Sequence, residues 1–275
     1  MTSQFYAHEL IIDDDYEVAH RDSLMGMARG YDPSSVDLSI YGMMNPPSQI
    51  QLIPRSEWSE RIREKERTKS RLSDLLLRAG IPSTNQASDG YCWAYSTVGC
   101  LQVVREFNGL PFIPLNPHSV AATIKRGANQ GGWCGLSGRF VMENGVAPMG
   151  TGEGEWPELS RDYRRHEPRC RERMKQFRAT EGWIDLGLRD YEQAMSFDMV
   201  ASCLLSNIPC ALDFNWWGHS VMGCDLVEVG QGGFGIRIRN SWTDRWGDKG
   251  FSVLAGSKAI PNGAIGLRSV RGVAA

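Results

Sequence analysis

The feature that most constrains the fold is a change in the sequence pattern near residue 208. Before it, apolar residues recur at helical spacing in two stretches, 72–76 and 92–107, and the second stretch ends at Asn108-Gly109, a typical helix stop. After it, short apolar runs alternate with glycine turns, as in antiparallel strands. These runs lie at 210–214, 220–227 and 234–239. We therefore predict an α+β protein with a helical first lobe and a β second lobe.

The charge balance excludes one large class of function. The 275 residues include 30 Lys or Arg and 32 Asp or Glu, which gives a net charge of −2. This balance argues against a dedicated nucleic-acid or anionic-membrane binder. Residues 161–178 are locally basic, but no aromatic platform accompanies them. We interpret this stretch as a solvated, partly helical insertion and expect no nucleic-acid partner and no membrane.

Five residues form a pattern suited to thiol chemistry. Cys92 opens the predicted helix, where the helix N-terminus favours a thiolate, and Gln86 lies six residues upstream. The Gln86 amide and the Cys92 backbone N–H would form an oxyanion hole. His219 precedes one apolar strand and Asn240 follows the next. Adjacent antiparallel strands would bring them together, with Asn240 fixing the imidazole tautomer and Trp242 covering the bond.

These residues stand in blocks that resemble the signature blocks of papain-like cysteine peptidases. The blocks are Gln86 with Cys92-Trp93-Ala94-Tyr95-Ser96, then His219-Ser220-Val221, then Asn240-Ser241-Trp242. The resemblance covers residues 70–270 and implies the papain-like two-lobe fold. In that fold a helical left lobe, about 67–155, would carry the nucleophile. An antiparallel β-barrel-like right lobe, about 180–275, would carry His219 and Asn240.

The resemblance also implies a role for each matching residue. Cys92 would attack the scissile carbonyl, His219 would move the proton, Asn240 would orient His219, and Gln86 would hold the oxyanion. Trp242 and Trp93 would support the active site. The glycine-pair segment and the residue before the histidine would bind substrate: Gly131, Gly132, Trp133 and Gly218. No cofactor is implied, and without a CxxC pair no metal site is expected.

The cysteines depart from the family pattern. Asp89 and Asn129 stand where many members carry two cysteines joined in one disulfide, and Ile265 stands at another position that is often cysteine. The chain has seven cysteines, an odd number, so at least one is unpaired. We expect the six besides Cys92 to be reduced, although a Cys203–Cys210 bridge stays open.

The N-terminus contains no signal-peptide pattern, because residues 1–10 lack a basic region and a long apolar run. No run reaches the length of a transmembrane helix. We therefore expect an intracellular protein, with a virion location as an alternative.

Residues 1–66 precede the catalytic domain, 67–275, as an extension. We predict a charged helix from Ser56 to Arg67 with Ser56 as its N-cap. The extension would be either a propeptide that crosses the cleft and is cleaved, or an arm that docks elsewhere, contacts a protein partner and stays.

The leading hypothesis is a thiol peptidase that hydrolyses peptide or protein substrates through an acyl-enzyme on Cys92. One alternative is a structural or assembly component, in a viral particle or a large bacterial complex, on a papain-like scaffold. Another is a related amidase, isopeptidase or acyl transferase that uses the same residues.

Overall fold

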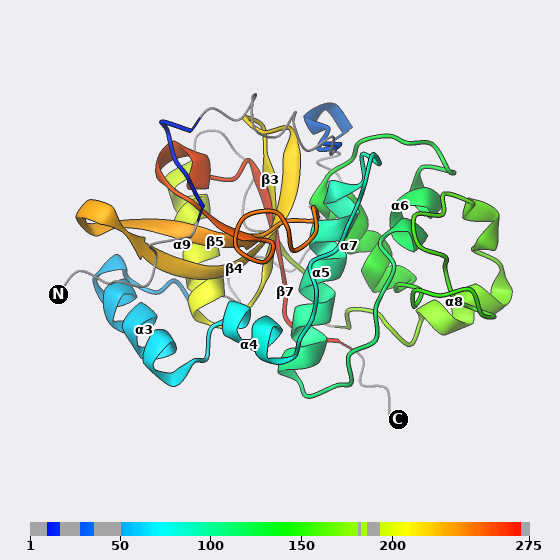
Figure 1. The fold of residues 1–275 in the computed structure, drawn as a ribbon, viewed down its shortest axis with the longest axis horizontal. Helices are drawn as coiled ribbons and strands as arrows, with labels where there is room; N and C mark the ends of the chain where they lie inside the picture. The colour runs from blue at the N-terminus through cyan, green and yellow to red at the C-terminus, as the bar shows by residue number, and fades with distance from the viewer. Residues whose placement is uncertain (1–9, 17–27, 36–50, 181–182, 186–192, 271–275) are drawn as a thin grey trace.

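The computed structural model describes residues 10–16, 28–35, 51–180, 183–185 and 193–270. Helices and strands separate into two lobes that meet along one central helix, α5 (Figure 1). The sheet lies on one side of α5 and the helices α6, α7 and α8 lie on the other. The predicted α+β two-lobe organisation is confirmed.

The helical lobe is built around α5, Cys92–Phe107, whose bounds are those predicted from the sequence. Nearly every residue of α5 is buried, because its faces are covered both by the sheet and by the other helices. The other helices of this lobe are short: α4 Leu72–Arg78, α6 His118–Ile124, α7 Cys134–Glu143 and α8 Pro168–Met174. The core of this lobe therefore depends on α5.

One sheet of seven strands forms the second lobe, in the order β1-β6-β5-β4-β3-β7-β2. All neighbours are antiparallel except β1 and β6. The strands are β1 Ile11–Ile12, β2 Trp183–Asp185, β3 Cys210–Phe214, β4 His219–Val229, β5 Gly233–Arg239, β6 Phe251–Leu254 and β7 Gly263–Leu267. The helix α9, Gln193–Leu205, packs against this sheet. The strands predicted at 210–214, 220–227 and 234–239 are confirmed.

The N-terminal extension is attached to the β lobe at two places. Ile12 of β1 is buried, and helix α3, Arg55–Thr68, buries Trp58 and Ile62 in the core of the same lobe. The predicted N-cap was wrong: α3 begins at Arg55 after Pro54, so Ser56 lies inside the helix. Pro54 is the N-cap residue, with an extended backbone and no side-chain capping hydrogen bond. The helix also continues past residue 66, so the expected division between extension and domain falls within α3.

Several other predictions can be compared with the structure. Residues 161–178 are partly helical, as predicted, with α8 as their main element. All seven cysteines are free and buried, so Cys203 and Cys210 do not form a bridge. No described helix has the length and apolar character needed to cross a membrane. Within the described ranges, no group of three or more His, Cys, Asp or Glu side chains is arranged to hold a metal ion.

Candidate active site

The imidazole of His219 and the amide of Asn240 are in direct contact. β4 begins at His219 and Asn240 directly follows β5, so the hairpin brings them together, with His219 Nε2 2.8 Å from Asn240 Oδ1. Asn240 Oδ1 also accepts the Ser241 backbone N–H at 2.8 Å. Since Oδ1 can only accept, Nε2 carries the proton in this arrangement. Nδ1 has no hydrogen-bond partner among the described residues. It is therefore available to exchange a proton.

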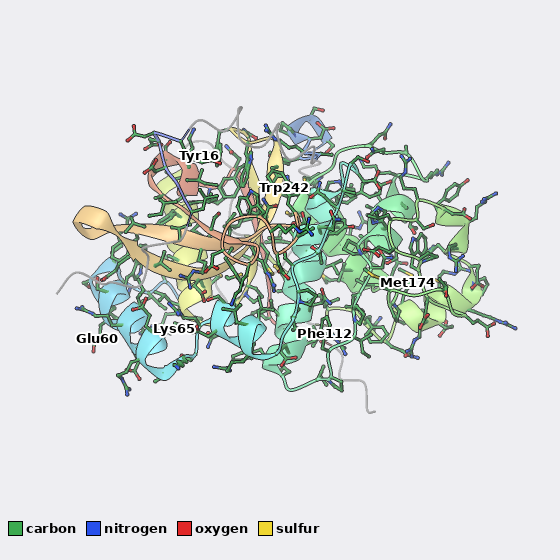
Figure 2. The ribbon with its side chains drawn as sticks, viewed as in Figure 1. Tyr16, Glu60, Lys65, Phe112, Met174 and Trp242 are labelled. Atoms are coloured by element: carbon green, nitrogen blue, oxygen red, sulfur yellow. The ribbon has the colours of Figure 1, made fainter. Side chains whose placement is uncertain are left out.

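Tryptophan rings enclose this pair. Trp242 stacks on the imidazole of His219, with 4.6 Å between ring centroids, and Trp217 approaches the imidazole edge-on at 5.0 Å. Trp246 packs against both tryptophans. Figure 2 shows Trp242 near the middle of the molecule, where the two lobes meet. The rings exclude water from the His219–Asn240 hydrogen bond, which strengthens it.

Cys92 lies at the first position of α5, and α5 packs on β4. Ser220, the residue after His219, lies near the Cys92 thiol and lowers its pKa. The packing thus brings the thiol next to the residue that follows the imidazole. Both groups are fully buried, with exposed fractions of 0%.

Burial changes the charge state of both groups. It raises the pKa of the Cys92 thiol to about 12, against the opposing effect of hydrogen bonds from Ser220 and Gly30. It lowers the pKa of His219 to about 3, against the opposing effect of the Asn240 hydrogen bond. For both groups, burial favours the uncharged form and acts against the effect of the helix N-terminus on the thiol.

Gln86 lies beside the pair and is fully buried. Its Nε2 donates to two carbonyl oxygens, Ala28 at 2.7 Å and Asp89 at 2.9 Å. Its Oε1 accepts from the Ser241 hydroxyl, and its backbone N–H donates to the Ser241 carbonyl at 3.0 Å. One donor expected to face an oxyanion therefore faces a carbonyl of the chain's own N-terminal extension.

Residues 28–32, which we call the cleft segment, run along the residues predicted to bind substrate. The Gly132 N–H donates to Gly30 O at 2.8 Å, and the Asp32 N–H donates to Gly132 O at 2.9 Å. The Tyr31 N–H donates to Gly218 O at 3.1 Å. The backbone of Gly30 also lies near the Cys92 thiol and lowers its pKa. The backbone groups of Gly132 and Gly218 are thus occupied by an extended peptide, the kind of ligand predicted for them.

Glycines allow this close approach. A Cβ atom on Gly30 would lie 2.0 Å from the Gly90 carbonyl oxygen, and one on Gly131 would lie 2.7 Å from Gly30 O. Real Cβ atoms do not approach other atoms so closely, so no side chain fits at either position. The Trp93 ring packs against Gly132, since a Cβ on Gly132 would lie 2.6 Å from that ring. The cleft segment therefore packs closely against the glycine pair, where the Gly30 backbone and the Asp32 side chain both approach Gly131.

Trp133, the third residue of the predicted substrate-binding segment, is buried, as Cys92 and His219 are. Its exposed fraction is 1%, and its ring packs over Gly135 in α7. The next residue, Cys134, belongs to a buried cluster that the sequence did not indicate. Cys134 contributes an N–H and a thiol, both 3.0 Å from the Asp213 carboxylate, and the Ser220 hydroxyl donates to the same carboxylate. Burial raises the pKa of Asp213 to about 6.

Hydrogen bonds join the two segments that a disulfide joins in many family members. Asn129 Oδ1 accepts the Gly90 N–H at 2.7 Å, and Asn129 Nδ2 donates to Ser88 O at 3.2 Å. The Asp89 carboxylate points elsewhere, to His118 Nε2 at 2.8 Å. A reducible covalent link is thus replaced by polar contacts between the same segments.

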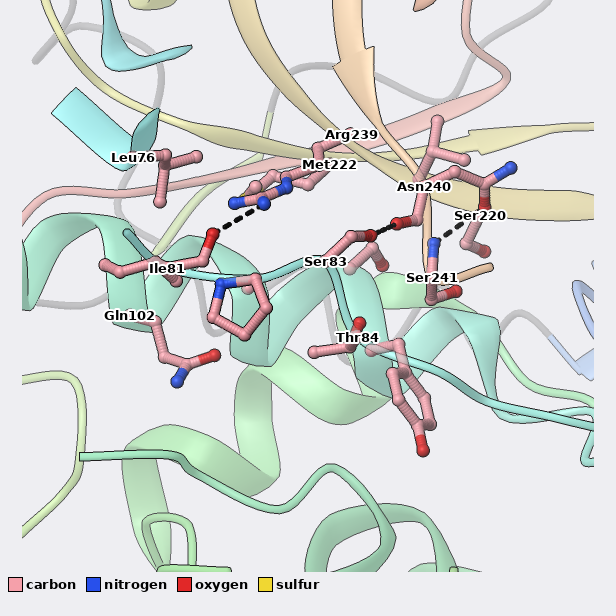
Figure 3. A pocket seen from close by; sticks show the side chains of 15 residues that line it. Leu76, Ile81, Ser83, Thr84, Gln102, Ser220, Met222, Arg239, Asn240 and Ser241 are labelled. Carbon is pink, nitrogen blue, oxygen red and sulfur yellow. Dashed lines mark hydrogen bonds between the residues drawn. The ribbon is translucent and has the colours of Figure 1, made fainter. Parts of the chain in front are cut away.

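A small cavity borders Asn240 on the side of the helical lobe (Figure 3). Its volume is about 30 Å³, which is room for one or two water molecules and not for a peptide. Ser83 crosses it and donates its hydroxyl to Asn240 O at 2.5 Å, while the Arg239 guanidinium donates to Ile81 O at 2.6 Å. This cavity belongs to the contact between the lobes, and it is not where a substrate would bind.

Curated proteins of similar sequence are cysteine peptidases. Cathepsin L 2 of Paramecium tetraurelia is 26% identical over 188 residues, which are 62% of this chain and 54% of that protein. Cysteine endopeptidase RepA of Oryza sativa subsp. japonica is 26% identical over 208 residues, 66% of this chain and 51% of that protein. The chain thus spans about half the length of these relatives. No protein-family model matches it.

Solved structures show the same fold. Xylellain, a cysteine protease from Xylella fastidiosa, matches with a TM-score of 0.55 at 14% identity, over 90% of this chain and 97% of that one. Procathepsin L 3 from the larval midgut of Tenebrio molitor matches with a TM-score of 0.54 at 16% identity, over 66% of this chain and 64% of that one. Sequence and fold together confirm the predicted resemblance.

Proposed function

We propose, for a chain similar to papain-like cysteine peptidases in both sequence and fold, that it hydrolyses peptide bonds with Cys92 as nucleophile. The observation that supports this proposal is the His219–Asn240 pair, whose Nδ1 has no hydrogen-bond partner among the described residues, together with Cys92 at the first position of α5, the helix that packs on β4. A cysteine, an oriented imidazole and nearby amide donors are what acyl transfer through a thioester needs.

The reaction would follow from these positions. His219 Nδ1 takes the thiol proton, and the Cys92 sulfur attacks the scissile carbonyl carbon. The oxyanion accepts hydrogen bonds from Gln86 Nε2 and the Cys92 backbone N–H. His219 then protonates the leaving amine, the C–N bond breaks, and an acyl-enzyme remains on Cys92. Water, deprotonated by His219, hydrolyses the thioester and restores the thiol.

The substrate would be an extended peptide or protein segment. The backbone groups of Gly132 and Gly218, which hold Gly30, Tyr31 and Asp32 here, would bind its backbone. The peptidase names of the similar proteins favour hydrolysis over an assembly role. The buried, unpaired thiols support a reducing, intracellular location.

The cleft segment would hold the enzyme in an inactive state. It occupies Gln86 Nε2 through the Ala28 carbonyl and fills the backbone hydrogen-bonding groups of Gly132 and Gly218. The extension is joined to the β lobe through β1 and α3, so the cleft segment would move out of the site without leaving the molecule. This combines both expected roles of residues 1–66, inhibitor and retained arm.

Substituting Gly30 tests this proposal. Gly30→Ala places a Cβ against the Gly90 carbonyl and should expel the cleft segment. We expect alkylation of Cys92 by iodoacetamide at pH 7, followed by mass spectrometry, to accelerate at least about tenfold as the thiol regains solvent. Hydrolysis of fluorescein-labelled casein should appear in parallel.

Three controls make the result decisive. Gly230→Ala adds a Cβ where no atom lies within 4 Å and should change nothing. Cys92→Ala should abolish both labelling and hydrolysis. Tyr31→Ala removes a buried side chain of the cleft segment and should act like Gly30→Ala. Labelling of Cys92 without any casein hydrolysis in the folded Gly30→Ala variant would overturn the peptidase proposal. Unchanged labelling would overturn the inhibitory role.

A further inference from the structure

A second histidine, His118, is buried close to the candidate active site and belongs to none of the roles above. It is the first residue of α6 and its exposed fraction is 0%. Its Nε2 lies 2.8 Å from the Asp89 carboxylate, and its Nδ1 lies 3.1 Å from the Tyr95 hydroxyl. The backbone N–H of His118 donates to Asn116 Oδ1 at 2.9 Å, which fixes the start of the helix.

These contacts close a ring of bonds around the loop that carries Gln86. At one end the Tyr95 hydroxyl donates to Asn85 O at 3.0 Å. At the other end Asp89 O accepts from Gln86 Nε2 at 2.9 Å, and the Asp89 N–H donates to Gln86 O at 3.1 Å. The imidazole of His118 connects the two ends. A shift of the Asp89 side chain would therefore move the carbonyl that orients the Gln86 amide.

We propose that His118 and Asp89 are positioning residues that hold the 85–89 loop so that the Gln86 amide faces the reacting carbonyl. This rests on the proposed peptidase function. Neither residue touches Cys92 or His219 in any described hydrogen bond; they act through Gln86. The pair is an ionisable link in a buried position, so its effect on Gln86 also depends on its protons.

The number of protons on His118 and its partners determines how many hydrogen bonds of this ring can form. Nε2 must carry a proton, because the Asp89 carboxylate only accepts. Burial raises the pKa of Tyr95, so its hydroxyl keeps one proton for two possible acceptors, Asn85 O and His118 Nδ1. When the imidazole takes up a second proton, Nδ1–H donates to Tyr95 Oη and the hydroxyl is free to donate to Asn85 O. All the bonds of the ring then form at once.

Acid should therefore tighten the loop. Burial lowers the pKa of His118 below 6.5, opposed by Asp89, so the second proton is taken up on the acid side of neutrality. The other charged or titratable groups that face the imidazole are Tyr91 and Tyr95 of the α5 region and Glu158 and Arg161 of the loop beyond. Arg161 Nε lies 3.7 Å from Asp89 Oδ1 and disfavours the imidazolium.

The test uses the full-length chain carrying Gly30→Ala, so that the site is open. His118→Leu should lower kcat on fluorescein-labelled casein about 10- to 100-fold, the effect of displacing one oxyanion donor. KM and the iodoacetamide rate of Cys92 should change less than about threefold, since neither depends on Gln86. His118→Gln, whose amide can donate to Asp89 and accept from Tyr95, should recover most of kcat. On the acid side of neutrality the parent should gain activity relative to His118→Gln, which cannot titrate.

A double-mutant cycle with Gln86→Ala decides whether His118 acts through Gln86. In that background His118→Leu should have little further effect on kcat. The proposal would be overturned if the losses of kcat caused by His118→Leu and Gln86→Ala multiplied in the double variant. It would also be overturned by an unchanged kcat in His118→Leu, or by equal losses of kcat and of Cys92 alkylation.

A readout without turnover separates this proposal from the peptidase function. The peptide aldehyde acetyl-Leu-Leu-norleucinal adds reversibly to a thiol and forms an oxyanion that Gln86 would hold. His118→Leu should weaken its binding about tenfold and Gln86→Ala similarly, even if the parent hydrolyses no casein. Absent hydrolysis with this binding pattern counts only against the peptidase function. Equal aldehyde affinity in His118→Leu and the parent counts against the role of His118.

Discussion

At the scale of single residues, burial and hydrogen bonds together determine the state of the site. Burial favours the uncharged forms of Cys92 and His219, and a hydrogen bond fixes the orientation of the His219 imidazole. The His219 imidazole has a single hydrogen-bonding partner at Nε2, Asn240. Without that acceptor the ring is held only by Trp242 and Trp217, which restrain its plane but not which nitrogen carries the proton. The tautomer therefore depends on one amide.

Asn240→Ala should consequently lower kcat at least about tenfold in the Gly30→Ala background, because the imidazole loses its fixed tautomer. Asn240→Asp keeps an acceptor and adds a negative charge, which should raise the pKa of His219 and move the pH profile of casein hydrolysis toward higher pH. Equal kcat for Asn240→Ala and its parent would contradict this role.

Asp213 should make the stability of the protein depend on pH. Burial raises its pKa from 3.8 to about 6, so the folded chain holds a proton that the unfolded chain has released. The stabilising contribution is present at acid pH and is lost as pH rises through 6. Relative to Asp213→Asn, the unfolding free energy of the parent should fall by about 2 kcal/mol between pH 4 and 7, measured by urea unfolding. A pH-independent difference would contradict this.

At the scale of elements, the sequence predicted what local periodicity determines. The ends of α5 and the strands β3, β4 and β5 follow from apolar spacing and glycine turns. The pairing of His219 with Asn240 follows from the same strands, because adjacent antiparallel strands bring the two residues together. Features that depend on contacts between residues far apart in the sequence could not be predicted. The Asp225 carboxylate accepts the Leu72 N–H at 2.8 Å and so caps α4 from 153 residues away.

The position of the cleft segment also could not be predicted, because it depends on contacts with residues far away in the sequence. Residues 31–35 read as a loop, and nothing in their spacing indicates that Gly30 fits against Gly90 and Gly132. Similarly, α3 appeared as a charged solvent helix because only Trp58 and Ile62 face the core. Two buried residues in a helix of 14 give a weak amphipathic signal, although they fasten the extension to the β lobe.

The anchoring role of α3 predicts an asymmetry between its two faces. Trp58→Ala should lower the unfolding free energy by about 3–5 kcal/mol, since the side chain is fully buried against Phe197 and Phe234. Glu60→Ala, on the exposed face of the same helix, should change it by less than about 0.5 kcal/mol. Urea unfolding of both variants is the measurement, and equal effects would contradict the anchor.

At the scale of the whole molecule, the two lobes meet along a seam of backbone contacts beside the site. The Thr243 N–H donates to Thr84 O at 2.9 Å, and the Gln86 N–H donates to Ser241 O at 3.0 Å. The segment that carries Gln86 in the helical lobe is thus bonded to the residues that follow Asn240 in the β lobe. Rigid placement of the two halves of the site follows from this seam.

Two truncations should separate the inhibitory part of the extension from its structural part. Removing residues 1–50 deletes the cleft segment and β1 but keeps α3; Cys92 should then react with iodoacetamide at least about tenfold faster, with a Tm lower by only several degrees. Removing residues 1–68 also deletes Trp58 and Ile62 and should abolish cooperative unfolding. A stable, fully reactive 69–275 fragment would contradict this division.

The attachment of the extension on both sides of the cleft segment has a consequence for any competitor. A segment tethered at both ends behaves as an intramolecular ligand with an effective concentration of about 1 mM. A peptide of equal intrinsic affinity present at about 10 µM would therefore occupy the site about a hundredfold less often. Dilution of the enzyme would not weaken this competition, because the cleft segment belongs to the same chain. Occupancy by substrate would therefore depend on how tightly Gly30 fits, and not on the enzyme concentration.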